Sequence, residues 1–547
     1  MTVKRQLLKS ASVIAFATAI SRICGYLRDQ RITLLLGTSP AADAFILAFR
    51  IPNLIRRMTG GGALSASFIP VFTRRLREGS REEALTFARR MLWTIAGVMA
   101  VVAVLGSVFS RQVIYIFTLF GATHMRWDMA VYLNRIIFPC VLFIGLAALL
   151  GALLNSFHIF GIPASTAAVF NVTIILFSCA FVYRPVMRWA PAEFRSPAVA
   201  LAVGVLIGTV LQFVIQVPAA ARQGMKFLPS VSLSDPAVRK VGRLMAPAFF
   251  GMGVYQINFF VDTVFATASR MPAGSVTSLY IADRVMELVL GSYAIAMSTA
   301  LLPTMSRQAA DGRVGEMKHT FAFSLRIVSF ITIPAAVGLI LLRRPIVQVL
   351  FQHGKFVAES TALTAHALLF YSVGLPAYAA IKLITPMYYS TQDTATPARV
   401  GAYALGVNIA LNTCFLFFLF RYLSNATPAL ASSLTAYFNF ALLFVIFRKR
   451  YGLLGGRAIS ASMVKMAACA VAMAAVCLTA MHFANFDMTQ SLIARAGLLA
   501  GTIVAATSAY FGVAWALRCE ELPEFLLLLR RGGSAETETA PAASVEP

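Results

Sequence analysis

The hydrophobic and polar positions of the chain alternate in long blocks, and not with the short period of a surface helix or strand. Apolar stretches of about 20 residues or more recur between clusters of charged residues, glycine and proline, and a helix of that length crosses the hydrocarbon core of a bilayer. The pattern predicts fourteen membrane-spanning helices. They cover residues 10–36, 41–72, 91–110, 129–155, 162–183, 197–219, 244–268, 276–305, 320–342, 361–389, 397–420, 427–447, 459–482 and 489–517.

The composition agrees with a membrane protein. Of the 547 residues 59% are hydrophobic and only 13% are charged, whereas a soluble globular domain has about 45–50% and about 25%. In a soluble protein the net charge of +25 would suggest a nucleic-acid partner. Here the basic residues are separated by the apolar blocks, so we expect no nucleic acid. The predicted fold class is an all-α polytopic membrane protein.

Alternate loops differ in their content of lysine and arginine. One set, which includes both chain ends, holds about 25 of these residues and the other about 10. Because basic loops stay on the cytoplasmic side, this asymmetry predicts that both termini are cytoplasmic. The segment after Arg531 has no apolar periodicity, and we expect it to be disordered.

The chain contains an internal repeat. The segment Ala63–Arg74 aligns with Ala296–Arg307 at an offset of 233 residues, and Ser156 aligns with Ser390 at 234. Two copies of six helices each point the same way, as in parallel-repeat transporters, whose substrate site lies between the repeats. The predicted organisation is a lobe over residues 1–225, a second lobe over 226–450, two further spans within 451–520, and a cytoplasmic tail over 521–547.

A run of three glycines at residues 60–62 interrupts the second predicted span. Glycine lowers the cost of a kink or an unwound turn, so the run predicts a broken helix. The alternative is that these glycines only allow close packing between helices.

Arginine is unusually frequent inside the predicted spans. Arg22, Arg50, Arg56, Arg57 and Arg284 lie well within them, and acidic residues in the spans number only about five. An arginine at the centre of a lipid-facing helix costs roughly 2.5–3.5 kcal/mol, so these side chains must face water or partners. Guanidinium groups bind phosphate oxygens in pairs, and the excess of positive charge predicts a cavity for a phosphate or pyrophosphate. The alternative is a set of structural ion pairs.

Several segments resemble the MurJ (MviN) family. They are SRICGYLRDQ at 21–30, ADAFILAFRIPNLIRRM at 42–58, GALSASFIPVF at 62–72, YIADRVMEL at 280–288, FQHGKF at 351–356 and YYSTQDTATP at 388–397. The resemblance implies the fold of the multidrug/oligosaccharidyl-lipid/polysaccharide exporters, which is MATE-like, and a location in the bacterial inner membrane. It also implies a flippase, not an enzyme, that moves lipid II by alternating access. Lipid II and membrane lipids are the expected partners, with the cell-wall synthesis machinery as a further one.

The resemblance also assigns candidate substrate-binding residues. Family-essential arginines carry over onto Arg22, Arg28, Arg56 and Arg284, with Asp43 and Lys382 as further motif residues and Asp29 and Asp283 beside two of the arginines. The two aspartates either exchange ion pairs during transport or hold their neighbours in one rotamer. The last two spans are expected to form an apolar groove for the polyprenyl tail.

A second set of residues suggests a driving force. Asp262 is the lone acid of the seventh span, while Asn408 and Asn412 lie one turn apart in the eleventh and Thr435 lies in the twelfth. Together they offer oxygen ligands for Na⁺ or a route for H⁺; the alternative is hydrogen bonding between helices. Dependence on the membrane potential is a third expectation. The chain has no Walker motif and no clustered acids for Mg²⁺, so neither ATP hydrolysis nor another cofactor is expected.

Two other functions stay open at this level. A flippase for another polyprenyl-pyrophosphate-linked glycan would need the same basic cavity. A cation-coupled multidrug antiporter of the same fold would need a cavity dominated by carboxylates, which the charge count disfavours.

Overall fold

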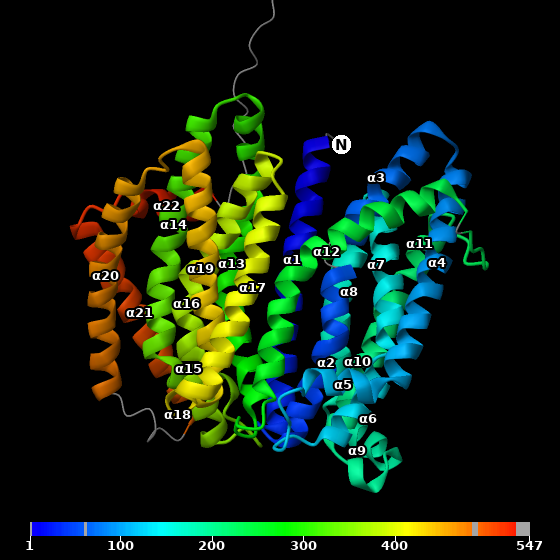
Figure 1. Cartoon of the computed structure of the whole chain (residues 1–547), viewed down its shortest axis with the longest axis horizontal. Coiled ribbons are helices and arrows are strands. Elements are labelled where there is room, and N and C mark those ends of the chain that lie inside the picture. Colours follow the sequence, from blue (N-terminus) through cyan, green and yellow to red (C-terminus); the bar gives the residue numbers. More distant parts are fainter. Residues whose placement is uncertain (1–2, 60–62, 233, 484–490, 532–547) are drawn as a thin grey trace, which may run out of the picture. The chain divides into compact units, whose positions relative to one another are not determined.

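A computed structural model describes residues 3–59, 63–232, 234–483 and 491–531. These residues form helices and no strands (Figure 1). The predicted glycine break at 60–62 and the predicted disordered segment after Arg531 lie outside the described residues.

The helices have the following bounds in chain order. The first part of the chain forms α1 (Val3–Leu36), α2 (Pro40–Thr59), α3 (Ala63–Glu78), α4 (Arg81–Val108), α5 (Ser110–Phe117), α6 (Trp127–Ile137), α7 (Cys140–Ser156), α8 (Gly161–Phe177), α9 (Ala180–Trp189), η1 (Ala192–Phe194), α10 (Pro197–Val214), α11 (Val217–Arg222) and α12 (Pro236–Ala266). The second part forms α13 (Ser275–Ala310), α14 (Val314–Leu341), α15 (Arg343–Phe351), α16 (Ala358–Ser390), α17 (Ala395–Cys414), η2 (Phe415–Leu419), α18 (Phe420–Leu423), η3 (Ser424–Ala426), α19 (Thr427–Tyr451), α20 (Gly456–Phe483), α21 (Leu492–Ala516) and α22 (Glu521–Arg531).

The predicted membrane character is clear in these helices. Eight helical stretches among the described residues are long and apolar enough to cross a membrane, and a bent pair made by α8 and α9 would be a ninth. The helices that carry the arginines, α1, α2 and α13, are 34, 20 and 36 residues long, which at 1.5 Å per residue also suffices for a crossing. The number fourteen itself stays a prediction.

Local sequence explains where several helices begin. Ser80 caps α4 with Glu83 in a capping box, while Ser196 and Asp235 cap α10 and α12, each followed by proline at the first helical position. These side chains satisfy backbone N–H groups that have no partner inside the helix, and proline lacks the N–H that would be orphaned there.

Both copies of the repeat are helical. The first copy, Ala63–Arg74, lies in α3, and the second, Ala296–Arg307, lies in α13. Pro70 and Pro303 occupy the same repeat position inside a helix.

The described chain divides into two compact units. The first comprises Met1–Asp283, Leu350–Ala367 and Gly401–Ser432, and the second Arg284–Val349, Leu368–Val400 and Ser433–Pro547. Segments 226–283, 350–367 and 401–432, predicted as parts of the second lobe, lie in the first unit. The predicted lobe limits themselves stay a prediction.

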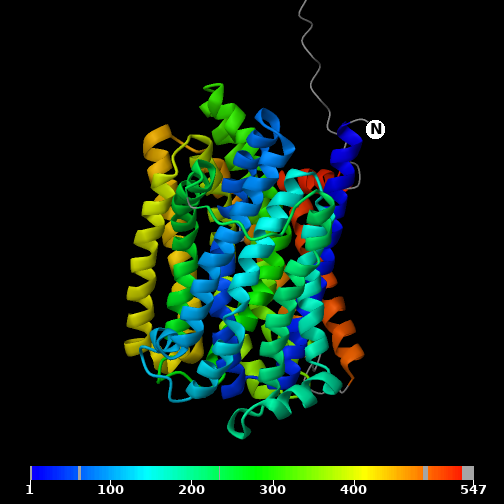
Figure 2. The same ribbon diagram turned by 90° about the vertical axis from the view of Figure 1, so that its right-hand side faces the viewer.

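Each unit has its own apolar core. In the first, α4 packs on α7 and α8 packs on both α1 and α10 (Figure 2), with Phe68, Phe72 and Phe87 among the fully buried side chains. In the second, α20 packs on α14 and α21 (Figure 1), and Phe330 and Tyr510 lie in its core.

Candidate functional site

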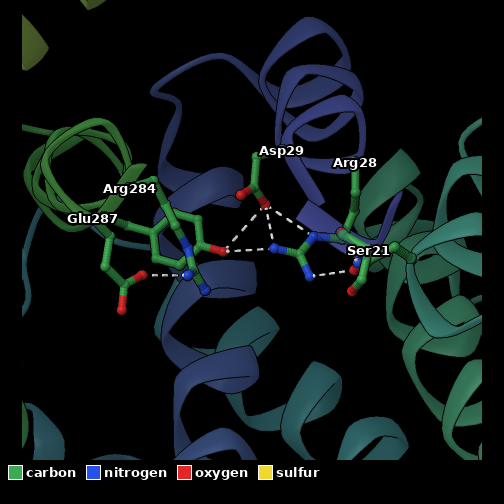
Figure 3. Close-up of polar contacts among 7 residues, drawn as sticks. Ser21, Arg28, Asp29, Arg284 and Glu287 are labelled. Carbon is green, nitrogen blue, oxygen red and sulfur yellow. Dashed lines mark hydrogen bonds and ion pairs between the residues drawn. The ribbon is translucent and has the colours of Figure 1, made fainter. Parts of the chain in front are cut away.

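Arg28, on α1, lies at the centre of a buried polar network in the first unit (Figure 3). Its Nε and Nη2 donate to Asp29 Oδ1 at 2.9 and 2.7 Å, and its Nη1 donates to Asn171 Oδ1 at 2.8 Å. The Tyr280 hydroxyl lies 3.3 Å from Arg28 Nη2 and donates to Asp29 Oδ1 at 3.2 Å. Arg28 and Asp29 are only 6% and 4% exposed, so the predicted pairing of these neighbours is present inside the protein.

Asn171 also ties the network to the backbone of α1. Its Nδ2 donates to the carbonyl of Ser21 at 3.0 Å, and the guanidinium of Arg28 lies 5.7 Å from the ring centre of Phe49 on α2. Both amide ends of Asn171 are therefore used. Neither Asn171 nor Tyr280 was among the candidate residues, because each lies far from Arg28 in the chain and no sequence pattern links them to it.

Arg50 approaches the same tyrosine. Its guanidinium lies 5.5 Å from the ring centre of Tyr280, and its Nη1 donates to Thr263 Oγ1 at 2.8 Å. The sequence places Arg50 well inside the second predicted span. It is not one of the family-essential arginines, so it was not a candidate binding residue. The geometry places it beside the Arg28 network.

Arg22 and Arg56 are exposed side chains of the first unit. Arg22 precedes Arg28 by six residues on α1, about 9 Å along the helix axis. Arg56 lies near the end of α2, where its Nε donates to Asn53 Oδ1 at 2.8 Å. Both guanidinium groups are thus accessible from outside the protein interior.

Arg284 is the first residue of the second unit and forms an ion pair with Glu287 one turn along α13, at 2.6 Å (Figure 3). Both side chains are partly exposed, at 24% and 39%. The sequence analysis placed Asp283 beside Arg284 and counted Glu287 only among the acids inside the spans. Asp283 is buried on α13, and Lys382 is half-buried on α16.

Asp43, on the first turn of α2, is fully buried and holds the start of α13. Its carboxylate accepts hydrogen bonds from the backbone N–H groups of Gly274 and Thr277 at 2.7 and 2.8 Å, and from Thr277 Oγ1 at 2.7 Å. These contacts give Asp43 a positioning role, because they occupy both carboxylate oxygens. Direct contact of Asp43 with a substrate stays a prediction.

Asp262 contacts two of the other residues that the sequence predicts to bind a cation. Its Oδ1 accepts from Asn408 Nδ2 and Asn412 Nδ2 at 3.3 and 3.2 Å, and its Oδ2 accepts from the hydroxyl of Ser432. Ser432 was missed by the sequence reasoning, which chose Thr435, three residues later on α19. Since residues i and i+3 lie on the same side of a helix, the two hydroxyls share a face of α19.

The donor set around Asp262 fits a small hard cation in its chemistry. No group of three or more His, Cys, Asp or Glu side chains that could hold a metal ion occurs within the described residues. One carboxylate with amide and hydroxyl oxygens would serve instead, and such cations prefer oxygen ligands. Asn412 Oδ1 and Thr435 Oγ1 are buried and have no hydrogen-bond partner within the described part of the chain.

An apolar groove of about 280 Å³ lies in the second unit. Residues of α13, α14, α15, α20, α21 and α22 line it, among them Phe330, Pro334, Met473, Ile503 and Phe511. This is where the resemblance predicts the site for a polyprenyl tail, in a groove that includes the last two long helices.

Comparisons with known proteins bear on what these features do. The family model described as "Lipid II flippase MurJ" matches residues 32–496. The "Probable lipid II flippase MurJ" of Vibrio cholerae is 36% identical over 455 residues, which cover 81% of this chain and 83% of that one. The "Lipid II flippase MurJ" of Burkholderia cenocepacia is 31% identical over 523 residues, which cover 93% and 97%.

Solved structures agree on the fold. A lipid II flippase MurJ in an inward closed conformation superimposes with a TM-score of 0.74 at 24% identity, covering 92% of this chain and 98% of that one. An inward-facing MATE-family multidrug transporter of the MOP superfamily gives 0.64 at 15% identity, covering 81% and 95%. The MATE-like fold class expected from the sequence is confirmed, and on the strength of the family model and the curated relatives the chain belongs to the MurJ family of lipid II flippases.

Proposed function

We propose that the chain moves lipid II, the lipid-linked peptidoglycan precursor, from the cytoplasmic to the outer leaflet of the bacterial inner membrane by alternating access. Both termini then lie in the cytoplasm, as the distribution of basic residues between loops predicts. The observation that carries the proposal is the placement of Arg22, Arg28, Arg50 and Arg56 on the first two helices of one compact unit in a chain of this family.

In this mechanism guanidinium groups take the place of water around the pyrophosphate. Arg22, Arg28, Arg56 and Arg284 are the proposed ligands, with Asp283 and Lys382 near the path of the headgroup. Arg28 already presents two N–H groups to one oxygen of Asp29, and the paired oxygens of a phosphate match that arrangement. The carboxylate of Asp29 is therefore a substitute ligand that keeps the guanidinium oriented until the substrate arrives.

The headgroup and the polyprenyl tail of the substrate differ in polarity and therefore need different surroundings. Moving a sugar–peptide headgroup through hydrocarbon would leave many polar groups without partners, at several kcal/mol each, so the headgroup travels in a hydrated space. The polyprenyl tail stays in an apolar environment, and the groove lined by Phe330, Met473 and Phe511 supplies one.

Complementation tests this function. A strain depleted of its own lipid II flippase should grow with the wild-type chain and fail with Arg22→Ala, Arg28→Ala, Arg56→Ala or Arg284→Ala at equal membrane levels. Arg188→Ala, an exposed arginine of α9, is the matched control and should rescue growth. If all four variants rescue as well as the control, the pyrophosphate is not bound by these arginines; failure of the wild type would favour a different polyprenyl-linked glycan.

We infer further that transport is coupled to Na⁺ bound by Asp262, Asn408, Asn412 and Thr435, with Ser432 as an added ligand. The amide nitrogens of both asparagines face Asp262, and rotation of either amide would turn an oxygen toward the same point. The unpartnered Asn412 Oδ1 supports the proposal, because a buried oxygen without a partner costs free energy that a cation would recover.

Flipping in vesicles tests the coupling. The rate should rise with an imposed Na⁺ gradient and lose that dependence in Asp262→Asn, which keeps the size of the side chain and removes its charge. A K⁺ gradient and a K⁺/valinomycin potential of equal size are the controls. Equal rates with and without the Na⁺ gradient would exclude Na⁺ coupling, and a response only to the potential would assign the driving force to the membrane voltage.

A further inference from the structure

A polar cavity of about 720 Å³ lies in the first unit, and none of the residues proposed above for substrate or Na⁺ lines it. Three arginines contribute to its wall: Arg111 from α5, Arg126 just before α6, and Arg135 two turns into α6. The cavity is therefore a separate basic feature of the molecule that lipid II transport does not explain.

The three guanidinium groups are free of carboxylate partners. Asp128 and Glu193 also line the cavity, yet within the described ranges no ion pair joins them to any of the three arginines. Arg111 lies over the ring of Trp127 at 5.4 Å, and Arg126 donates to the backbone carbonyl of Glu193. Three positive and two negative side chains leave a net charge of +1 and several N–H groups available to an anion.

The limits of the candidate membrane spans indicate that the cavity lies at the level of a membrane surface. The span Arg81–Val108 ends just before α5, Trp127–Ser156 begins at the cavity, and Pro197–Arg222 begins four residues after Glu193. Trp127, Tyr132 and Phe194 line the wall, and aromatic side chains with polar edges concentrate at the level of lipid headgroups.

Exposed apolar side chains lie close in the chain to the residues that line the cavity. They are Val108 (63% exposed), Phe109 (48%), Tyr115 (62%), Ile116 (49%), Leu119 (56%) and, on α9, Trp189 (92%). Large exposed apolar side chains at the ends of membrane-spanning helices fit contact with the acyl chains of lipids.

We propose that the cavity binds the phosphodiester of a membrane phospholipid at the face opposite the predicted cytoplasmic one. Arg111, Arg126 and Arg135 hold the phosphate oxygens, and the acyl chains run along the exposed apolar side chains beside α5. Guanidinium groups bind phosphate oxygens in pairs, and the single negative charge of phosphatidylglycerol neutralises the net charge of the cavity.

Native mass spectrometry of the delipidated full-length protein tests the site. Titration with phosphatidylglycerol should give one bound lipid, and the double variant Arg111→Gln/Arg135→Gln should weaken it by about tenfold or more, because each removed guanidinium loses a charge-assisted hydrogen bond. The matched control is Arg184→Gln/Arg188→Gln, which removes two exposed arginines of α9 outside the cavity. It should bind like the wild type.

Two further measurements distinguish a lipid phosphate from a free phosphate and control for loss of folding in the variants. Glycerol 3-phosphate at the lipid's concentration should not displace the lipid; equal competition would show a site for free phosphate and overturn the assignment to a membrane lipid. Thermal unfolding of the variants should match that of the wild type, and Arg111→Lys should retain part of the binding. Equal lipid binding by the cavity variant and the control would overturn the proposal.

Discussion

At the residue scale, Arg28 shows how a buried charge is tolerated in a membrane protein. Its guanidinium donates to Asp29 and Asn171, lies near the Tyr280 hydroxyl and faces the ring of Phe49. An isolated buried charge would be prohibitively costly, whereas this network pairs it and leaves it oriented for a ligand with planar oxygen pairs.

Arg28→Lys should separate the geometry of this network from its charge. A lysine ammonium keeps the positive charge but has no planar fork, so it loses the bidentate contact and the simultaneous bond to Asn171. We expect the flipping rate in proteoliposomes to fall by at least about tenfold, the equivalent of one charged hydrogen bond, at unchanged insertion. Arg31→Lys, which alters a neighbouring arginine bonded to Ser178, is the control; equal rates for the two variants would contradict a special role for the fork.

At the scale of elements, carboxylates at helix starts hold helices that are distant in sequence. Asp43 on α2 accepts two backbone N–H bonds at the start of α13, and Asp235 caps α12 while pairing with Arg75 of α3 and Arg90 of α4 at 3.1 and 2.9 Å. Each interaction satisfies orphan N–H groups and joins two or more helices.

Asp43→Asn should destabilise the first unit. The amide keeps one acceptor and turns an NH₂ group toward backbone donors, so at least one charge-assisted bond is lost, at about 2 kcal/mol. The measurement is the thermal unfolding temperature in detergent. Asp311→Asn, an exposed residue of the turn after α13, is the control, and a drop no larger than that of the control would show that Asp43 does not carry the start of α13.

The contacts of Asp235 predict that the stability of the protein depends on pH. Burial of the carboxylate raises its pKa, but the Ala237 N–H and the guanidinium groups of Arg90 and Arg75 together lower the pKa below its usual range. A lowered pKa in the folded state contributes stability above the ordinary value of about 3.9, and that stability is lost as pH falls through the folded-state pKa. The wild type should therefore exceed Asp235→Asn in unfolding temperature at pH 6–7, and the difference should shrink toward pH 3. A difference that is constant over this range would contradict the assignment.

At the scale of the molecule, the first unit contains a tight seam between the end of α1 and the segment around α16. The Lys355 N–H donates to the Leu34 carbonyl at 2.9 Å, and the hydroxyls of Thr38 and Ser360 lie 2.7 Å apart. Gly37 and Gly354 have φ of +61° and +60°, and a Cβ on either would lie 2.3–2.5 Å from a carbonyl oxygen across the seam. Both glycines therefore permit a backbone contact that any other residue would prevent.

We expect this contact to open during alternating access. The double variant Thr38→Cys/Ser360→Cys places two thiols within reach of a disulfide, because the native side-chain oxygens are in contact. Oxidation should arrest flipping in proteoliposomes, and dithiothreitol should restore it. Each single cysteine variant is a control that should be insensitive to the oxidant; undiminished transport by the crosslinked protein would show that the seam stays closed during the cycle.

Much of this protein is determined by the sequence. Apolar blocks of span length, with basic residues concentrated in alternate loops, specify an all-helical membrane protein, because a helix satisfies its own backbone groups within lipid. The motifs around Arg22, Arg28 and Arg284 specify the family, and the excess of arginine over acids inside the spans predicts an anionic substrate. These conclusions depend on local patterns and on counts, which require no knowledge of contacts.

The tertiary structure decided which side chains are partners. Asn171 lies 143 residues from Arg28 and Ser432 lies 170 residues from Asp262, and a polar residue in a membrane helix carries no sequence signal of the helix it will meet. Arg284 pairs with Glu287, which lies one turn away on the same face of α13. Helix packing sets the direction in which each side chain points. The role of Asp43 as a cap and the basic cavity around Arg111 follow from that packing, because the hydrophobic pattern fixes only which face of a helix is buried.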